Sequence, residues 1–232
     1  MKSTLSILAA ALFSCAAPAA EASMVADLAI VNRSTGERLQ TYRHAGRLYV
    51  AGKPGDRYAL EIRNRTGERL LTVVSVDGVN VVSGETASAS QRGYVLAPLG
   101  STEIAGWRKS SEEVAAFYFT ALPDSYAART NRLANVGVIG IAAFREYREP
   151  VVASQESVLG GSRMDAAPAA PAANKTEAKR SAGAEERLGT GHGERVHAPA
   201  RQVEFRKASE RPDEIITVYY DSLENLRAQG II

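Results

Sequence analysis

The sequence predicts a mainly β protein: an antiparallel β-sandwich over residues 25–147, a disordered linker, and a C-terminal strand and short helix that dock on the sandwich. Three observations lead to this. Short apolar runs separated by turn signals recur through residues 25–147, which is typical of sandwiches. One Asp-Gly turn joins two runs whose residues match in register. The only cysteine, Cys15, lies in the N-terminal segment, so the fold must be stabilised by its hydrophobic core without a disulfide.

Residues 1–22 have the layout of a secretory signal peptide. Lys2 supplies the positive start, residues 5–13 form a short apolar core, and residues 16–22 are mostly alanine. A membrane-spanning helix would need about 20 apolar residues, which this core does not reach. We therefore expect export to the periplasm or cell envelope.

Two ways of processing this signal remain open. Ordinary cleavage fits after Ala22 or after Ala19, because small residues stand at the required positions. Alternatively, residues 12–15 resemble a lipoprotein box that ends in the lipid-accepting Cys15, although Phe13 is bulky for its position. In the second case we expect an outer-membrane lipoprotein.

Composition limits the classes of partner. The 232 residues contain 28 Lys and Arg against 26 Asp and Glu, a net charge of +2. A balance this close to neutral predicts neither nucleic-acid binding nor adsorption to anionic membranes. After the signal no apolar run is long enough to span a bilayer, so we expect no transmembrane segment in the mature chain.

The clearest predicted unit is a hairpin over residues 72–83. Asp-Gly is favoured in two-residue hairpin loops because both positions adopt positive φ. The resulting register pairs Val76 with Val79, Ser75 with Asn80 and Val74 with Val81. Apolar residues thus face apolar ones, and the turn and the pattern agree.

Three other strands follow from their patterns. In residues 58–63 apolar Tyr58, Leu60 and Ile62 alternate with less apolar residues, as in a strand with one wet face. Residues 114–120 and 136–144 are apolar at nearly every position. The second run predicts a central strand covered on both faces.

The composition changes at Arg148. Residues 148–187 are rich in alanine, proline and charge, with few large apolar groups, which predicts a disordered linker. Within residues 188–232, residues 214–220 are typical of a strand. Asp221 followed by Glu224 predicts a helix N-cap, and the helix should run to Gln229 and end at Gly230. Because so short an element is unstable alone, we expect it to dock on the sandwich, with docking on a partner as the alternative.

Residues 189–197 form the one cluster that suggests chemistry. Its glycines would allow a ligand close to the backbone, and His192, Glu194 and His197 could serve as acid, base or metal ligands. Residues five apart face opposite sides of a strand, so joint metal ligation is not expected. We interpret this segment as a flexible loop and predict no metal and no cofactor.

Two further places are candidates for binding. Trp107, the only tryptophan, either packs in the core or forms an exposed platform, and the core is favoured for a lone tryptophan in a strand. Asp124, Tyr126 and Arg129 lie in the longest break between predicted strands, where sites often occur.

Several short motifs together resemble an uncharacterised family of exported proteobacterial proteins. The resemblance covers residues 60–146 and 188–232 and omits the linker. It implies an exported single-unit protein and assigns no catalytic residue. The motifs are Val76–Val81, Gly93–Val95, Ile104–Arg108, Val114–Phe117, Asn135–Gly140, Gly189–Glu194 and Tyr220–Leu226.

The sequence thus favours an exported, non-catalytic envelope protein that acts as a binding or assembly module and meets its partner through residues 188–232. An enzyme, possibly a hydrolase, is the alternative, with His192 as general base or acid and Glu194 orienting it. A lipid-anchored scaffold through Cys15 is a third hypothesis. The signatures of serine hydrolases, phosphate loops, zinc proteases and calcium loops are absent from the sequence.

Overall fold

The computed structural model describes residues 24–149 and 187–232. The first range contains the predicted sandwich, and the second contains the predicted C-terminal element. The predicted signal peptide with Cys15 lies outside the described residues, as does nearly all of the predicted linker.

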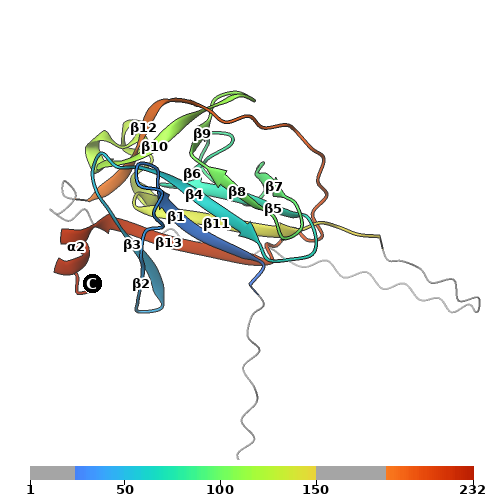
Figure 1. Ribbon diagram of the computed structural model, residues 1–232, viewed down its shortest axis with the longest axis horizontal. Helices are drawn as coiled ribbons and strands as arrows, with labels where there is room; N and C mark the ends of the chain where they lie inside the picture. The colour runs from blue at the N-terminus through green and yellow to red at the C-terminus, as the bar shows by residue number, and fades with distance from the viewer. Residues whose placement is uncertain (1–23, 150–186) are drawn as a thin grey trace, which may run out of the picture.

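Two β-sheets pack face to face (Figure 1), so the predicted mainly β sandwich is confirmed. Within the described residues, the strands of the first sheet are paired in the order β1-β4-β10-β12, with β8 beside β4 and β9 beside β10. The second sheet runs β2-β3-β13-β11-β5-β6, with β7 beside β5. The first sheet comprises β1 (Ala26–Asn32), β4 (Arg57–Asn64), β8 (Ser101–Ile104), β9 (Gly106–Arg108), β10 (Glu113–Ala121) and β12 (Leu188–His197). The second comprises β2 (Thr41–His44), β3 (Arg47–Gly52), β5 (Leu70–Val76), β6 (Val79–Asn80), β7 (Tyr94–Leu96), β11 (Val138–Arg145) and β13 (Glu214–Ser222).

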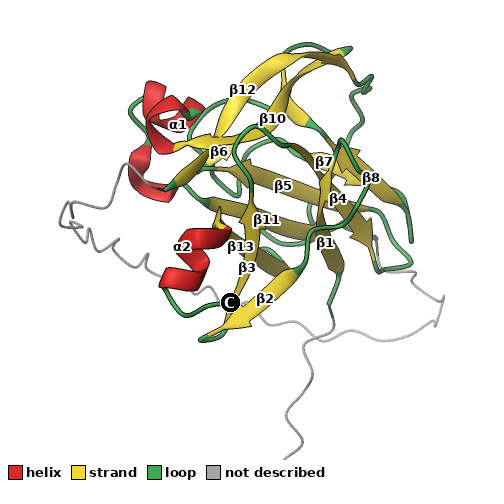
Figure 2. Cartoon of the chain, turned by 60° about the vertical axis from the view of Figure 1, so that its left-hand side comes forward, coloured by secondary structure: helices red, strands yellow, loops and turns green. Residues whose placement is uncertain are grey.

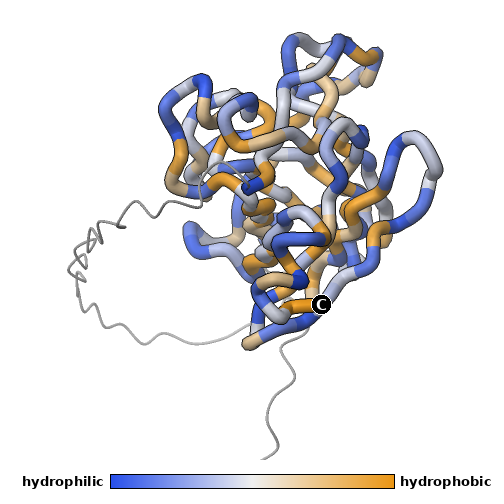
Figure 3. Tube along the Cα trace, turned by 90° about the vertical axis from the view of Figure 1, so that its left-hand side faces the viewer, coloured by the Kyte–Doolittle hydropathy of each residue, from blue (hydrophilic) through white to orange (hydrophobic). Residues whose placement is uncertain are grey.

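The core lies between the sheets and contains the residues that the alternating sequence pattern predicts to face inward. Tyr58, Leu60 and Ile62 of β4 are fully buried, as is Ile139 of β11. Hydrophobic positions gather in the interior of the chain trace and hydrophilic ones on its loops (Figure 3). Burial of this apolar surface is the main force that holds the sheets together.

The predicted hairpin is confirmed in turn and register. Asp77 and Gly78 have φ values of 53° and 72°, and Val76 pairs with Val79 and Ser75 with Asn80. The amide of Val81 donates to the carbonyl of Val74 at 3.0 Å. The second strand of the hairpin is shorter than expected, because β6 ends at Asn80 and the chain turns at once.

The C-terminal strand and helix dock on the sandwich, as predicted, and the strand enters the middle of a sheet. β13 lies between β11, with which it is antiparallel, and β3, with which it is parallel. That parallel pair makes the second sheet mixed. The helix α2 (Leu223–Ala228) follows directly and lies beside β13 and β3 (Figure 2).

The cap of this helix differs from the prediction by one residue. The amide of Asn225 donates to Ser222 Oγ at 3.1 Å, so Ser222 is the N-cap in place of Asp221. The Asp221 carboxylate is used elsewhere, since it accepts the amide of Leu188 at the start of β12. The expected end is confirmed, with Gln229 as C-cap and Gly230 at a φ of 68°.

Residues 198–213 return the chain from β12 to β13 over the outer face of the second sheet. Phe205 packs against buried Leu71, Val73 and Phe144. The ammonium of Lys207 lies 4.0 Å from the centre of the Phe144 ring, a cation–π contact. In the described ranges no helix has the length and apolar character needed to cross a bilayer.

Candidate functional site

Three of the residues singled out from the sequence lie together. Trp107 stacks on His192 with ring centres 6.1 Å apart, and Tyr126 lies 5.1 Å from Trp107 and 5.4 Å from His192. Trp107 is only 2% exposed, so its prediction as a core residue is confirmed and the exposed platform is wrong. The indole Nε1 is buried without a hydrogen-bond partner in the described part of the protein.

The surroundings of His192 favour its neutral form. Burial lowers the pKa of His192, and the nearby cations Lys109 and Arg129 lower it further. Glu194 does not orient it, because the Glu194 carboxylate forms an exposed ion pair with Arg57 at 2.9 Å. The structure therefore gives little support to the acid–base pair suggested for the enzyme hypothesis.

The expectation that His192 and His197 face opposite sides of a strand is wrong. A β-bulge leaves β12 one residue longer than β10, with His192 opposite Phe117 and His197 opposite Glu113. Both histidines therefore lie on one face, about 13 Å apart, because they span four residues of β10 at the rise of a strand. Among the described residues no three His, Cys, Asp or Glu side chains could hold a metal ion together.

The break between β10 and β11 contains the other candidates. Asp124 ends the short 3₁₀ helix η1 (Leu122–Asp124), and the one-turn helix α1 (Tyr126–Arg129) follows, with η2 (Leu133–Asn135) after it. Asp124 and Arg129 are exposed, whereas Tyr126 turns toward Trp107. Of this segment, only Tyr126 is in ring contact with His192.

The expected flexible loop at residues 189–197 is wrong, because this segment is strand β12. The glycines fit the strand beneath neighbouring side chains. A Cβ at Gly191 would overlap the Tyr118 ring, and one at Gly189 would collide with Ser125. These glycines allow close packing of strands, a role that the sequence alone does not distinguish from ligand approach.

We expect Gly191→Ala to lower the free energy of unfolding by about 1–3 kcal/mol, because the added methyl group displaces the Tyr118 ring. Urea unfolding monitored by circular dichroism measures the loss. In a Tyr118→Ala background the same substitution should cost much less. An equal cost in both backgrounds would show that Tyr118 is not what requires glycine here.

A buried polar network joins the two sheets, and its only trace in the sequence pattern is one turn residue. Asp77 is fully buried and accepts hydrogen bonds from the amides of Gly137 at 2.9 Å and Thr190 at 2.7 Å. The Tyr220 hydroxyl donates to the same carboxylate at 2.5 Å. Thr190 Oγ1 lies 2.7 Å from the Tyr220 hydroxyl and 2.6 Å from that of Tyr58.

This network has a structural role. Desolvation raises the pKa of Asp77 to about 6, against the opposing effect of its donors. Burial and the Asp77 charge likewise raise the pKa values of Tyr58 and Tyr220. All the polar groups of the network face one another inside the core, so we assign the network to holding β12 and β13 in place.

A groove of about 820 Å³ lies at the open side of the sandwich. It lies where β1, an edge strand of the first sheet, faces the β2–β3 hairpin and the first half of β13 in the second sheet. Partly buried Leu28, Leu48 and Ile216 line it and pack against the core cluster. The groove thus has an apolar floor.

The rim of the groove is basic. Five arginines line it against three carboxylates. Two are paired, since Arg38 binds Glu61 at 2.6 Å and Arg65 binds Asp27 at 3.2 Å. The guanidinium of Arg47 lies over the Tyr219 ring. The remaining two, Arg43 and Arg63, are exposed and have no ion pair in the described part of the chain.

The first border of the groove is an open strand edge. In an antiparallel ladder alternate residues turn their amide and carbonyl toward the same side. The Ile30 carbonyl of β1 turns away from β4, because it accepts the amide of Leu39 at 2.8 Å. By the same alternation the backbone groups of Leu28 point away from β4, and no strand of the described residues pairs with them.

The second border is the unpaired first half of β13. Pairing with β3 begins only at Val218 opposite Leu48, so Glu214–Thr217 have no strand on that side. The amide of Tyr220 points toward β11, because it donates to the carbonyl of Gly137, the residue just before that strand. Ile215 lies an odd number of residues earlier, so its backbone groups are directed away from β11. The Ile215 side chain is 68% exposed.

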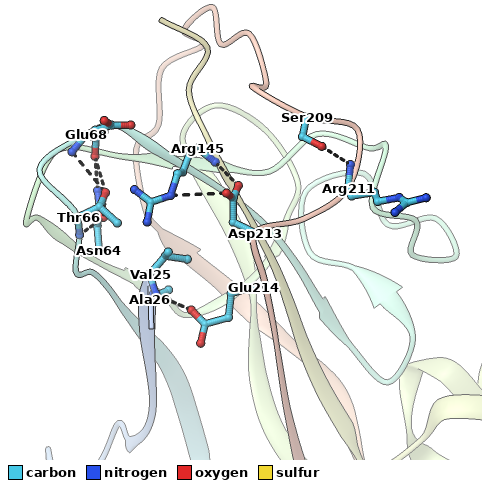
Figure 4. A network of polar contacts seen from close by, with 10 residues as sticks. All are labelled: Val25, Ala26, Asn64, Thr66, Glu68, Arg145, Ser209, Arg211, Asp213 and Glu214. Carbon is cyan, nitrogen blue, oxygen red and sulfur yellow. Dashed lines mark hydrogen bonds and ion pairs between the residues drawn. The ribbon is translucent and has the colours of Figure 1, made fainter. Parts of the chain in front are cut away.

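Glu214 joins the two borders at one end. Its carboxylate accepts the amides of Val25 and Ala26 at 2.7 and 3.0 Å, so the start of β13 caps the start of β1 (Figure 4). Nearby, the Asp213 carboxylate accepts the amide of Arg145 at 2.8 Å. The groove is therefore closed at this end and bounded by fixed strands along its sides.

Of the predicted site residues that the structure describes, none lies in this groove. It is built from residues that are far apart in the sequence, and its character depends on which strand edges remain unpaired. The predicted partner-contacting range 188–232 does contribute to it, through β13.

The fold and this groove define a two-sheet β-sandwich with a basic groove at one open side. Comparison of the chain with protein-family models, with curated proteins and with solved structures finds no match. Support for a function therefore comes from the residues and their geometry.

Proposed function

We propose that the protein is an exported, non-catalytic binding or assembly module of the cell envelope, and that the groove between β1, the β2–β3 hairpin and β13 is its binding surface. One observation supports this above others: two cations without an ion pair among the described residues, Arg43 and Arg63, line a groove that has an apolar floor and two open strand edges. Apolar contact with a few charged groups on a fixed scaffold is the usual character of a binding site.

Two features of the sequence support export: the signal-peptide pattern of residues 1–22, and the resemblance of residues 60–146 and 188–232 to an exported family. Lipid attachment at Cys15 remains an alternative within the proposal. The partner contact suggested for residues 188–232 is narrowed here to Glu214–Tyr219, which line the groove.

The enzyme hypothesis has weaker support. His192 stacks on Trp107 and makes a tilted ring contact with Tyr126, which would suit recognition of an aromatic group. However, Glu194 is bound by Arg57, and the glycines are needed for packing. In the enzyme case, His192→Ala would abolish turnover and keep the fold intact.

Site-specific crosslinking in the native envelope tests the proposal. We expect a photoreactive benzoylphenylalanine in place of Ile215 to yield one discrete adduct with an envelope component. The same probe in place of Val203, which is 47% exposed on the return segment, serves as the reference position.

The adduct should weaken when Arg43→Gln and Arg63→Gln are introduced together. A matched control changes Arg92→Gln and Arg201→Gln, two exposed arginines without an ion pair among the described residues. Equal adducts from both probe positions, or no effect of the groove arginines, would contradict the proposal.

A further inference from the structure

We propose that the groove binds an extended acidic segment of a partner protein by strand addition, with the segment pairing to the open edge of β1. This rests on the proposed function and adds the chemical class of the ligand. The inference comes from three features of the groove: its unpaired backbone groups, the alternation of its side chains, and its charge.

Unpaired backbone groups line both borders of the groove. Leu28 directs its amide and carbonyl into the open side of the sandwich, and Ile215 does the same from the opposite border. An unpaired edge of this kind is a template for another strand, and strand addition is a common mode of peptide recognition. The Ala26 amide is already bound by Glu214 and the Ile30 carbonyl by Leu39, so the free edge centres on Leu28. Ala26–Leu28 is about 10 Å long, which matches roughly three residues of an added strand.

The side chains of the groove define a pattern with a period of two. Successive residues of an added strand would face alternately the inner and the outer side of the first sheet. On the inner side, apolar side chains of the added strand would contact Leu28, Leu48 and Ile216. Arg63, which pairs in register with Asp27, lies on the outer side together with Glu61 and its partner Arg38.

The charge of the groove determines which polar residues of the bound segment alternate with its apolar ones. Arg38 and Arg65 are already paired with carboxylates, and Glu214 is bound to two amides. Arg47 lies over the Tyr219 ring, so among the described residues Arg43 and Arg63 are the groove cations left with neither an ion pair nor a ring contact. A segment in which glutamate or aspartate alternates with aliphatic residues would meet both demands. An arginine-rich or lysine-rich segment would be repelled.

The alternative is that the edge of β1 is protected against strand pairing and binds no partner segment. Charged side chains on an edge strand are a common device against unwanted strand pairing, and β1 carries Asp27 beside Arg65. The test must therefore separate specific strand addition from simple attraction between charges.

The test uses three fluorescent hexapeptides and the full chain, with fluorescence anisotropy at low ionic strength. The first alternates valine and glutamate, the second alternates valine and lysine, and the third is the first with every second backbone amide methylated. We expect only the first to bind. Its affinity should fall about tenfold in the variant with Arg43→Gln and Arg63→Gln, as for two lost ionic contacts near the surface, and stay unchanged with Arg92→Gln and Arg201→Gln.

Two results would overturn the inference. Equal binding of the methylated peptide would show attraction of charge without strand pairing, and failure of the glutamate peptide to bind would show that the edge is only protected. In either case a discrete Ile215 adduct that depends on the groove arginines would leave the proposed function standing with a ligand of another class. Loss of the adduct as well would contradict both the strand-addition inference and the proposed function.

Discussion

A chain that ends at Arg187 is expected to stay unfolded at every temperature. The truncation removes β12, which pairs with β10 along most of its length, and β13, the strand between β11 and β3. It also removes Tyr220 and Thr190, leaving the buried Asp77 carboxylate without two of its donors. An uncompensated buried charge alone costs several kcal/mol, which is comparable to the whole stability of a domain.

Circular dichroism and two-dimensional NMR of the truncated chain measure this outcome. The matched experiment adds residues 188–232 as a separate polypeptide, which should restore the fold because the missing strands have defined places in both sheets. A truncated chain that unfolds cooperatively on its own would contradict this prediction, because it would show that the sandwich is stable without β12 and β13.

The second large effect is expected at Asp77. Asp77→Ala removes the acceptor of two buried amides and one buried hydroxyl, each of which then loses its partner. Unsatisfied buried donors cost about 1–3 kcal/mol each, and relief of the buried charge offsets part of the sum. We therefore expect the free energy of unfolding at pH 7 to fall by about 3 kcal/mol. Asp124→Ala, at an exposed position, should change it by less than about 0.5 kcal/mol.

The same carboxyl predicts an unusual dependence on pH. Its ordinary pKa is 3.8, and the fold raises that pKa to about 6, so the folded state binds the proton more tightly than the unfolded state. The contribution of Asp77 to stability is therefore greatest below pH 4 and declines as the pH rises to about 6, by about 3 kcal/mol in all.

Comparison with Asp77→Asn isolates this effect from the other carboxylates, since the asparagine does not titrate. Relative to that variant, the natural protein should lose stability as the pH rises from 4 to 7, which chemical denaturation at several pH values measures. A constant difference over this range would mean that the carboxyl of Asp77 is not perturbed by burial.

Local patterns were sufficient for part of the fold. The hairpin at Asp77 was predictable because turn and register are encoded within twelve residues, and β11 because a strand covered on both faces is apolar throughout. The strand character of β12 was not predictable. Its glycines look like a loop, and they become strand residues only because the Tyr118 ring and Ser125 pack above them.

The candidate site residues divide in the same way, into those that a local sequence pattern identifies and those that only the fold brings together. Trp107 and His192 were selected by residue type and Tyr126 by its place in the longest break between predicted strands, and the fold brings the three into contact. The pairing of Glu194 with Arg57 depends on a neighbouring strand and was missed. Asp77 was seen only as a turn residue because its donors Thr190 and Tyr220 lie 113 and 143 residues away. The groove depends on which edges the topology leaves open, and a sequence pattern does not show that.

Amide hydrogen exchange of the free, full chain, followed residue by residue by NMR, tests the central claim that two open strand edges border one groove. Neighbouring residues on the same strands provide the control, because alternate amides point into and away from the ladder. The structure predicts that the amides of Leu28 and Ile215 exchange much faster than those of Ala29 and Ile216. Equal protection of each pair would mean that both edges are already covered, and it would contradict the binding groove.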